Sequence, residues 1–200
     1  GTASESAAGE SAVSELAPAA HEAALARAKA RMGVVFDACP FPTGSCVSDV
    51  ERIGRFSFPM WSRATFRQYA RTFGLDVKKQ VNDLSRGMGM KLQLAFALAH
   101  APELLVLDEA TAGLDPLARD EVLDILRAFM ADESHGILVS SHITSDLEKI
   151  ADYVVCVDEG RVVFSCPVDD ITDKAGIPAF PAPIMFMRLV LYLLSSATIS

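Results

Sequence analysis

The chain has 200 residues, of which half are hydrophobic and 22% are charged, and its formal net charge is −8. This length and composition predict one globular domain with a sizeable core and exclude global disorder. The acidic balance and the lack of any Lys/Arg run argue against a nucleic-acid-binding surface, which needs clustered cations. The cysteines contain no CxxC pair, so free thiols are expected, with a disulfide or zinc site as the alternative: Cys39, Cys46, Cys156 and Cys166.

The first 31 residues predict a flexible leader followed by a helix. Residues 1–18 are rich in Ala, Ser and Glu and contain no apolar segment long enough for secretion. The chain begins with Gly1 rather than Met, which fits a processed product or a fragment. His21 to Arg31 is Ala-rich and is expected to be helical.

The middle of the chain predicts a buried strand and a group of helices. Gly33 to Phe36 is an apolar run that ends at Asp37. Cys39 to Pro42 must be a loop, because two prolines bracket one residue. Helical patterns follow over residues 48–55, 63–73 and 87–100. The core candidates in this part of the chain are Trp61 and Phe66.

From residue 104 onward, strands alternate with helices. Leu104 to Leu107 is a continuous apolar run, which is expected to be a strand covered on both faces. The following pattern predicts a helix over 116–130, a strand over 137–139, a helix over 145–150 and a hairpin of 153–157 with 161–164. This alternation implies a parallel α/β sheet.

The last segment, residues 178–200, is almost uncharged. Its apolar part is too short to span a bilayer, which takes ~20 residues, and Arg188 interrupts it. Three interpretations remain open for it: an interfacial helix, a helix that covers the core, or sequence from a shifted reading frame.

Two adjacent carboxylates, Asp108 and Glu109, end the strand that begins at Leu104. The carboxyl ends of strands are where α/β folds bind ligands. One carboxylate of such a pair can help to hold Mg²⁺ through water, and the next can polarise a water that attacks a phosphate. The alternative is an acidic strand end that binds no ligand.

Polar residues that suit a phosphate site lie on either side of this pair. Ser85 is a suitable N-cap, and Gly87 would let backbone N–H groups approach an anion at the positive end of the helix. An ordinary capped helix is the alternative. Asp115 ends the turn over residues 112–115, and His142 follows the strand over 137–139, so both are expected near the same edge of the sheet.

Together these segments resemble the ATP-binding-cassette (ABC) ATPases. Leu84 to Met88 (LSRGM) is similar to the signature, usually LSGGQ, and Leu104 to Glu109 resembles Walker B with its catalytic Glu. Residues 112–115 resemble the D-loop, and His142 resembles the switch histidine. The resemblance covers about residues 32–173. It is strongest to the ATPase partners of small bacterial exporters with ABC-2-type permeases, which share the LS(K/R)GM signature and a segment like residues 141–152.

The resemblance implies a fold, a partner set and a location. The expected fold is α/β, a P-loop NTPase-like (RecA-like) parallel sheet with an α-helical subdomain at about 41–100, within a partial nucleotide-binding domain over 32–177. The implied activity is ATP binding and hydrolysis with Mg²⁺, coupled to export through an ABC-2-type membrane permease. The implied partners are this permease and a second nucleotide-binding domain, in a homo- or heterodimer. The implied location is cytoplasmic, at the inner face of the cell membrane.

The resemblance also implies roles for individual residues. Asp108 would support Mg²⁺, Glu109 would be the general base, and His142 would contact the γ-phosphate. The signature would contact the ATP held by the opposite subunit, and its residues are Ser85, Arg86, Gly87 and Met88. Asp115 would be the D-loop carboxylate, and the permease would dock near Phe41 and Pro42.

Several departures from the family pattern affect these expectations. Arg86 replaces a glycine and could add a phosphate contact, and Met88 replaces a glutamine. Asp37 stands at the Q-loop position, where it would either face Mg²⁺ or cap the following turn. No GxxxxGK(S/T) loop, the Walker A phosphate-binding motif, occurs in the sequence, so the N-terminal part of the cassette is missing here. The isolated chain is therefore expected to have little or no ATPase activity.

The missing loop has a structural consequence and keeps other functions open. In this family the Walker A strand lies beside the strand over 137–139, so its loss is expected to expose an apolar edge that promotes aggregation.

Two alternative functions are a non-catalytic regulatory or binding protein derived from an ABC cassette, and a non-transport ABC ATPase.

Overall fold

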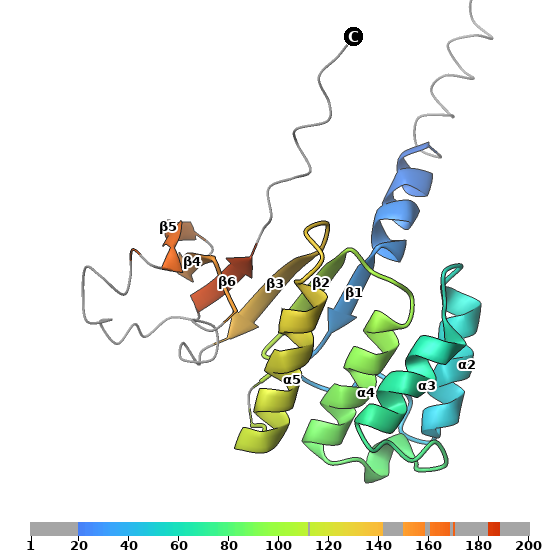
Figure 1. Cartoon of the computed structure of the whole chain (residues 1–200). Helices are drawn as coiled ribbons and strands as arrows, with labels where there is room; N and C mark the ends of the chain where they lie inside the picture. The colour runs from blue at the N-terminus through green and yellow to red at the C-terminus, as the bar shows by residue number, and fades with distance from the viewer. Residues whose placement is uncertain are drawn as a thin grey trace, which may run out of the picture.

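The described residues form a six-stranded sheet. The structure is a computed structural model, which describes residues 20–111, 113–141, 150–158, 161–168, 170 and 184–188. The strands are β1 (Met32–Val35), β2 (Leu104–Asp108), β3 (Gly136–Ser141), β4 (Tyr153–Asp158), β5 (Arg161–Pro167) and β6 (Ile184–Arg188). Their order across the sheet is β1-β2-β3-β6-β4-β5 (Figure 1). The predicted leader over 1–18 and almost all of the predicted helix over 145–150 lie outside the described residues.

The helices lie where the periodicity of the sequence predicts them. They are residues 20–30, α2 (Val47–Ser57), α3 (Arg63–Thr72), α4 (Arg86–Leu98) and α5 (Pro116–Phe129), with a short 3-10 turn, η1 (Val81–Asp83). Of the two core candidates, Phe66 is fully buried, whereas Trp61 is half-buried and packs beside it. Within the described part of the chain, no helix combines the length and the apolar composition that a membrane crossing requires.

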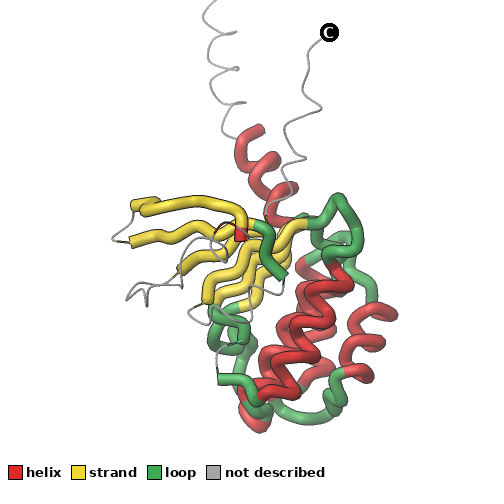
Figure 2. The backbone as a smooth tube through the Cα atoms, turned by 60° about the vertical axis from the view of Figure 1, so that its left-hand side comes forward, coloured by secondary structure: helices red, strands yellow, loops and turns green. Residues whose placement is uncertain are grey.

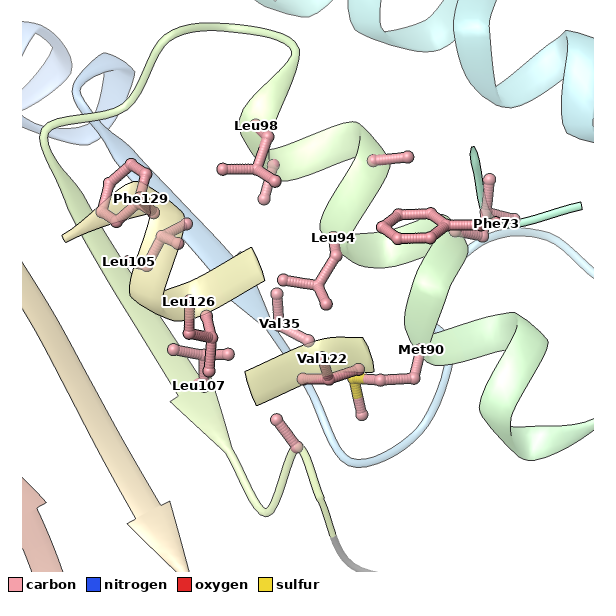
Figure 3. Close-up of a cluster of buried hydrophobic side chains, with 14 of the residues drawn as sticks. Val35, Phe73, Met90, Leu94, Leu98, Leu105, Leu107, Val122, Leu126 and Phe129 are labelled. Atoms are coloured by element: carbon pink, nitrogen blue, oxygen red, sulfur yellow. The ribbon is translucent and has the colours of Figure 1, made fainter. Parts of the chain in front are cut away.

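Strands β1, β2 and β3 are parallel, as the alternation of strands and helices predicts. Their register aligns Val35, Leu107 and Val139 in one row, and all three side chains are buried. Figure 3 shows this face of the sheet against Leu94 of α4 and Leu126 of α5. The core of the protein therefore lies between the parallel strands and these two helices.

The opposite face of the same strands is much less covered. Val34, Val106 and Leu138 form a row on this face; Val34 is 40% exposed, and the other two are half-buried. The described helices α4 and α5 lie on the other side of the sheet (Figure 2). The prediction that the strand over 104–107 is covered on both faces is thus wrong for the described residues. The reason is topological: the chain moves in one direction from β1 to β3, so right-handed crossovers place every connecting helix on the same face.

Two residues fit α4 closely against β1. A Cβ atom on Gly33 would lie 2.7 Å from Leu105 Cδ2 and 3.0 Å from Ala97 Cβ, so a glycine is needed for the helix to approach the strand. The buried Gln93 accepts a hydrogen bond from Phe36 N at 2.9 Å and donates one to Phe36 O at 3.1 Å. Its side-chain amide thereby pairs with the backbone of Phe36, just beyond the end of β1, as a neighbouring strand would.

For the end of the sheet formed by β4, β5 and β6, one prediction is confirmed and two are wrong. The antiparallel hairpin of β4 and β5 is confirmed. Residues 184–188 of the apolar tail form a strand, so neither helical interpretation holds for them. Strand β6 also pairs with β3, so the edge that was expected to be exposed is paired. The physical reason is that unpaired backbone groups accept any extended apolar segment, whatever its position in the chain.

The close approach at Gly33 makes a prediction about stability. We expect Gly33→Ala to lower the free energy of unfolding by about 1–3 kcal/mol, because the added methyl overpacks the contact between β1 and α4. Gly44→Ala is the matched control, since a Cβ atom there meets no atom within 4 Å. Urea unfolding followed by circular dichroism measures both variants, and equal midpoints would contradict the packing argument.

The buried His100 makes a prediction about pH. The residue is 2% exposed, its ring stacks on Phe58 with ring centroids 4.0 Å apart, and burial lowers the pKa of the imidazole. The unfolded chain, in which the pKa of histidine is about 6.5, therefore binds this proton more readily than the folded chain. We expect stability to fall as the pH is lowered from 7.5 to 5.5, and His100→Phe to flatten this slope. Thermal unfolding across this range measures it, and an unchanged slope in the variant would refute the assignment.

Candidate functional site

The carboxyl ends of the three parallel strands bring the candidate residues to one edge of the sheet. Asp37 follows β1, Asp108 ends β2 and Glu109 comes directly after it. The register pairs Asp108 with Ser140 near the end of β3. Parallel pairing therefore brings Asp37, Asp108 and Ser140, which are far apart in the sequence, to one edge of the sheet.

A serine hydroxyl connects the predicted Mg²⁺ residue, Asp108, with the predicted general base, Glu109. Ser140 Oγ donates a hydrogen bond to Asp108 Oδ1 at 2.6 Å and accepts one from Glu109 N at 3.2 Å. Glu109 N also lies 3.1 Å from the carbonyl oxygen of Ser140. These contacts fix the orientation of the exposed Asp108 carboxylate and the position of the Glu109 backbone.

The backbone of Glu109 adopts an unusual conformation. Its φ is +50°, in the left-handed region that residues with a Cβ atom seldom occupy. Such a conformation costs about 1–3 kcal/mol and persists where surrounding contacts fix it, often at functional sites. Here the hydrogen bonds to Ser140 hold it, so the chain turns sharply where β2 ends.

The start of α4 shows how the signature segment is built. Ser85 is the N-cap, and its Oγ accepts a hydrogen bond from Met88 N at 3.3 Å, which confirms the predicted cap. Met88 is partly buried and packs against the core, so its apolar side chain fits a position where the family has an amide. A Cβ atom on Gly87 would lie 3.6 Å from Leu114, which places the start of α4 against the turn before α5.

Arg86 joins the signature segment to two other predicted site segments. Its guanidinium pairs with the carboxylate of Asp37, the residue at the Q-loop position. A Cβ atom on Gly113, whose φ is +69°, would lie 3.3 Å from Arg86 Nη1, so Arg86 also lies against the D-loop turn. Both charged side chains are about half exposed, and such a surface pair contributes at most about 1 kcal/mol.

The D-loop carboxylate has a local structural role. Asp115 is the N-cap of α5, and its Oδ1 accepts a hydrogen bond from Ala118 N at 3.0 Å. This bond fixes the end of the turn that carries Gly113. Two other predicted site residues, Ala112 and His142, lie outside the described residues.

Ser140 is a site residue that the sequence analysis did not select. Its hydroxyl makes both of the side-chain contacts that organise Asp108 and Glu109. The signal that could have identified it is the alignment of two parallel strands that end at the same edge. This alignment places Ser140 opposite Asp108.

The donor set suits some cations and not others. Among the described residues, no group of three or more His, Cys, Asp or Glu side chains is arranged to hold a metal ion. Mg²⁺ needs no such cage, because it keeps several waters and binds one or two carboxylates together with phosphate oxygens. The single oriented carboxylate of Asp108 therefore fits Mg²⁺ bound together with a nucleotide.

The relatives of this chain include ATP-binding proteins of transporters. The bacitracin transport ATP-binding protein BcrA of Bacillus licheniformis is 38% identical over 99 residues, which are 50% of this chain and 32% of that protein. The daunorubicin/doxorubicin resistance ATP-binding protein DrrA of Streptomyces peucetius is 32% identical over 128 residues, 62% of this chain and 38% of that protein. The chain thus spans only about a third of the length of these relatives.

A structural comparison and a family model give the same assignment. A solved structure described as the ATP binding subunit of an ABC transporter matches with a TM-score of 0.63 and 26% identity, over 71% of this chain and 61% of that one. The family model for ABC transporters matches residues 7–112, more than half of the chain. The chain therefore belongs to the ABC transporter family.

Proposed function

We propose that the chain is part of the ATP-binding subunit of an ABC exporter, which couples ATP binding and hydrolysis to transport through an ABC-2-type permease. The observation that carries this proposal is the Asp108–Ser140–Glu109 arrangement, in which one hydroxyl orients a carboxylate and fixes a left-handed turn beside it. The relatives named for bacitracin transport and for daunorubicin/doxorubicin resistance support the exporter assignment.

The residues at the sheet edge divide the chemistry between them. Asp108 would help to hold Mg²⁺ through water, and Glu109 would accept the proton of the water that attacks the γ-phosphate. Mg²⁺, when bound with ATP, neutralises negative charge on the phosphates. Ser140 positions both residues through its two hydrogen bonds. His142, the residue after β3 in the sequence, would contact the γ-phosphate.

The signature segment serves a nucleotide held by a second domain. The N-terminus of α4 offers backbone N–H groups and a partial positive charge, which together favour a phosphate. Arg86 adds a guanidinium group there, and its pairing with Asp37 and its contact with Gly113 define where it lies. Because the 200 residues contain no GxxxxGK(S/T) loop, ATP is held by the phosphate loop of a partner domain, and the chain alone has little or no ATPase activity.

The permease would dock at the loop that follows Asp37, on the cytoplasmic side of the membrane. Phe41 is partly buried against Phe96, with ring centroids 5.0 Å apart, whereas Pro42 is exposed. A loop anchored by one aromatic ring and exposed at the next residue provides a fixed docking point close to Asp37.

The role of Glu109 can be tested by trapping a complex. We expect Glu109→Gln to accumulate an ATP-bound complex with a partner domain that carries GxxxxGK(S/T), because the amide cannot accept the proton. Gel filtration with radiolabelled ATP measures the complex. Glu133→Gln, which makes the same change at an exposed glutamate, is the control and should behave like the unchanged chain. If neither variant nor the unchanged chain forms an ATP-dependent complex, the proposed function is wrong.

Ser140 can be tested with a pair of substitutions. Ser140→Ala removes both hydrogen bonds, so we expect it to lower the free energy of unfolding by about 1–3 kcal/mol and the ATP hydrolysis rate of the complex by about tenfold or more. Ser140→Thr keeps the hydroxyl on a residue that suits strands, and should retain most of both. A positioning role requires Thr to rescue the hydrolysis rate; equal rates for Ala and Thr would reject it.

A further inference from the structure

A groove of about 730 Å³ lies where the helix over residues 20–30 meets β1 and α4. These three elements line it together with the end of α2 and the loop that begins at Phe36. The volume is typical of sites for small organic molecules, which enclose roughly 300–1,000 Å³. The lining includes none of the described residues of the candidate ATP site, so the groove is a separate place in the fold.

Aromatic rings are prominent among the lining residues of the groove. These rings belong to Phe36, Phe41, Phe58 and Phe96. The ring of Phe96 connects two of the others, with its centroid 5.0 Å from that of Phe41 and 5.8 Å from that of Phe58. Phe36 is 46% exposed, so its ring is not yet covered. Aromatic rings favour contact with other aromatic rings, stacked or edge to face, so the lining suits a ligand with an aromatic body.

The charge of the groove is confined to its exposed part. His100 also lines it, but burial lowers the pKa of this imidazole, so the ring is uncharged at pH 7. Lys29 is the only lining residue with a charged side chain at this pH, and it lies on the exposed helix over residues 20–30. Within the described part of the chain, Lys29 has no salt-bridge partner. An unpaired cation beside an apolar groove, in a chain with a net charge of −8, indicates a local preference for an anion.

We propose that the groove binds a small aromatic carboxylic acid, whose apolar body lies against Phe58 and Phe96 and whose carboxylate pairs with Lys29. A single ammonium group balances one negative charge, so a carboxylate fits better than a phosphate, which carries more. The buried part of the lining offers no charge, so the rest of the ligand is uncharged. This site goes beyond the proposed function and does not depend on it, because ATP plays no part in it.

The position of the groove gives its ligand contact with one segment of the candidate site. Phe36 and Phe41 both line the groove, and they lie on either side of Asp37 in the chain. A ligand that touches both rings restrains the loop between them. Binding in the groove should therefore make the segment around Asp37 more rigid without any contact with that carboxylate.

The charge preference can be tested with the full chain and two fluorescent probes, pyrenebutyrate and the neutral pyrenebutanol. Fluorescence titration at low salt should show that the acid binds about threefold more tightly than the alcohol, as expected for one exposed ion pair. Lys29→Gln should abolish this preference. Arg27→Gln is the control, because it removes one positive charge from the same helix at an exposed residue outside the lining, and it should keep the preference.

A second pair of substitutions tests the groove itself. Ala26 lines it from the exposed helix, so Ala26→Trp should fill part of the space and weaken the binding of both probes about tenfold. Ala23→Trp makes the same change on the same helix outside the lining, and should leave both affinities unchanged. Equal affinities for these two variants, a charge preference that survives Lys29→Gln, or no binding of pyrenebutyrate to the unchanged chain would each overturn the proposal.

A third measurement needs no substitution. Hydrogen exchange of the unchanged chain with saturating pyrenebutyrate should show slower exchange for the amides of residues 37–41, because the ligand restrains this loop. The amides of the β4–β5 hairpin, which contributes no lining residue, should exchange as they do without the ligand. Unchanged exchange over residues 37–41 would overturn the placement of the ligand between Phe36 and Phe41.

Discussion

The parallel pairing of β2 with β3 is the constraint on which the site depends. Its register places Asp108 opposite Ser140, and no local feature of either segment specifies that contact. Once the strands are aligned, a single hydroxyl can reach both the carboxylate of Asp108 and the backbone of Glu109. A shift of one residue would move these side chains to opposite faces of the sheet. The buried row of Val35, Leu107 and Val139 maintains the register, so the core and the site depend on the same alignment.

Helix α4 transmits this order to the rest of the candidate site. It packs on β1 through the close contact at Gly33, and its buried Gln93 binds the backbone of Phe36. Its first residue, Arg86, contacts Asp37 and the turn at Gly113. One helix thus touches the segments that follow β1 and β2, and a movement of α4 would alter the surroundings of both.

The sequence was sufficient for the parts of the fold that depend on local pattern. Helical spacing predicted α2 to α5 closely, and the apolar run before Asp108 predicted β2. The capping roles of Ser85 and Asp115 involve a backbone amide only three residues away, so the sequence at these positions was enough to indicate them. The turn residues between β4 and β5 likewise predicted a hairpin.

Features that depend on contacts between distant segments were not predictable in the same way. Residues 184–188 form a strand because β3 and β4 offer backbone groups with which they can pair. The apolar pattern of these five residues does not reveal that such partners exist. The open face of β2 follows from the direction of the crossovers rather than from its uniformly apolar sequence. The left-handed turn at Glu109 and the pairing of Arg86 with Asp37 depend on where neighbouring strands end.

The amide of Gln93 has a further consequence for how the molecule behaves in concentrated solution. It closes the β1 side of the sheet near Phe36, where an extended strand from a neighbour would otherwise attach. The opposite border, β5, carries the exposed side chains of Val162 and Val163. Since unprotected sheet borders attract other strands, the two ends of the sheet are unequal, and precipitation or fibre growth would start from the hairpin rather than from the side that carries α4.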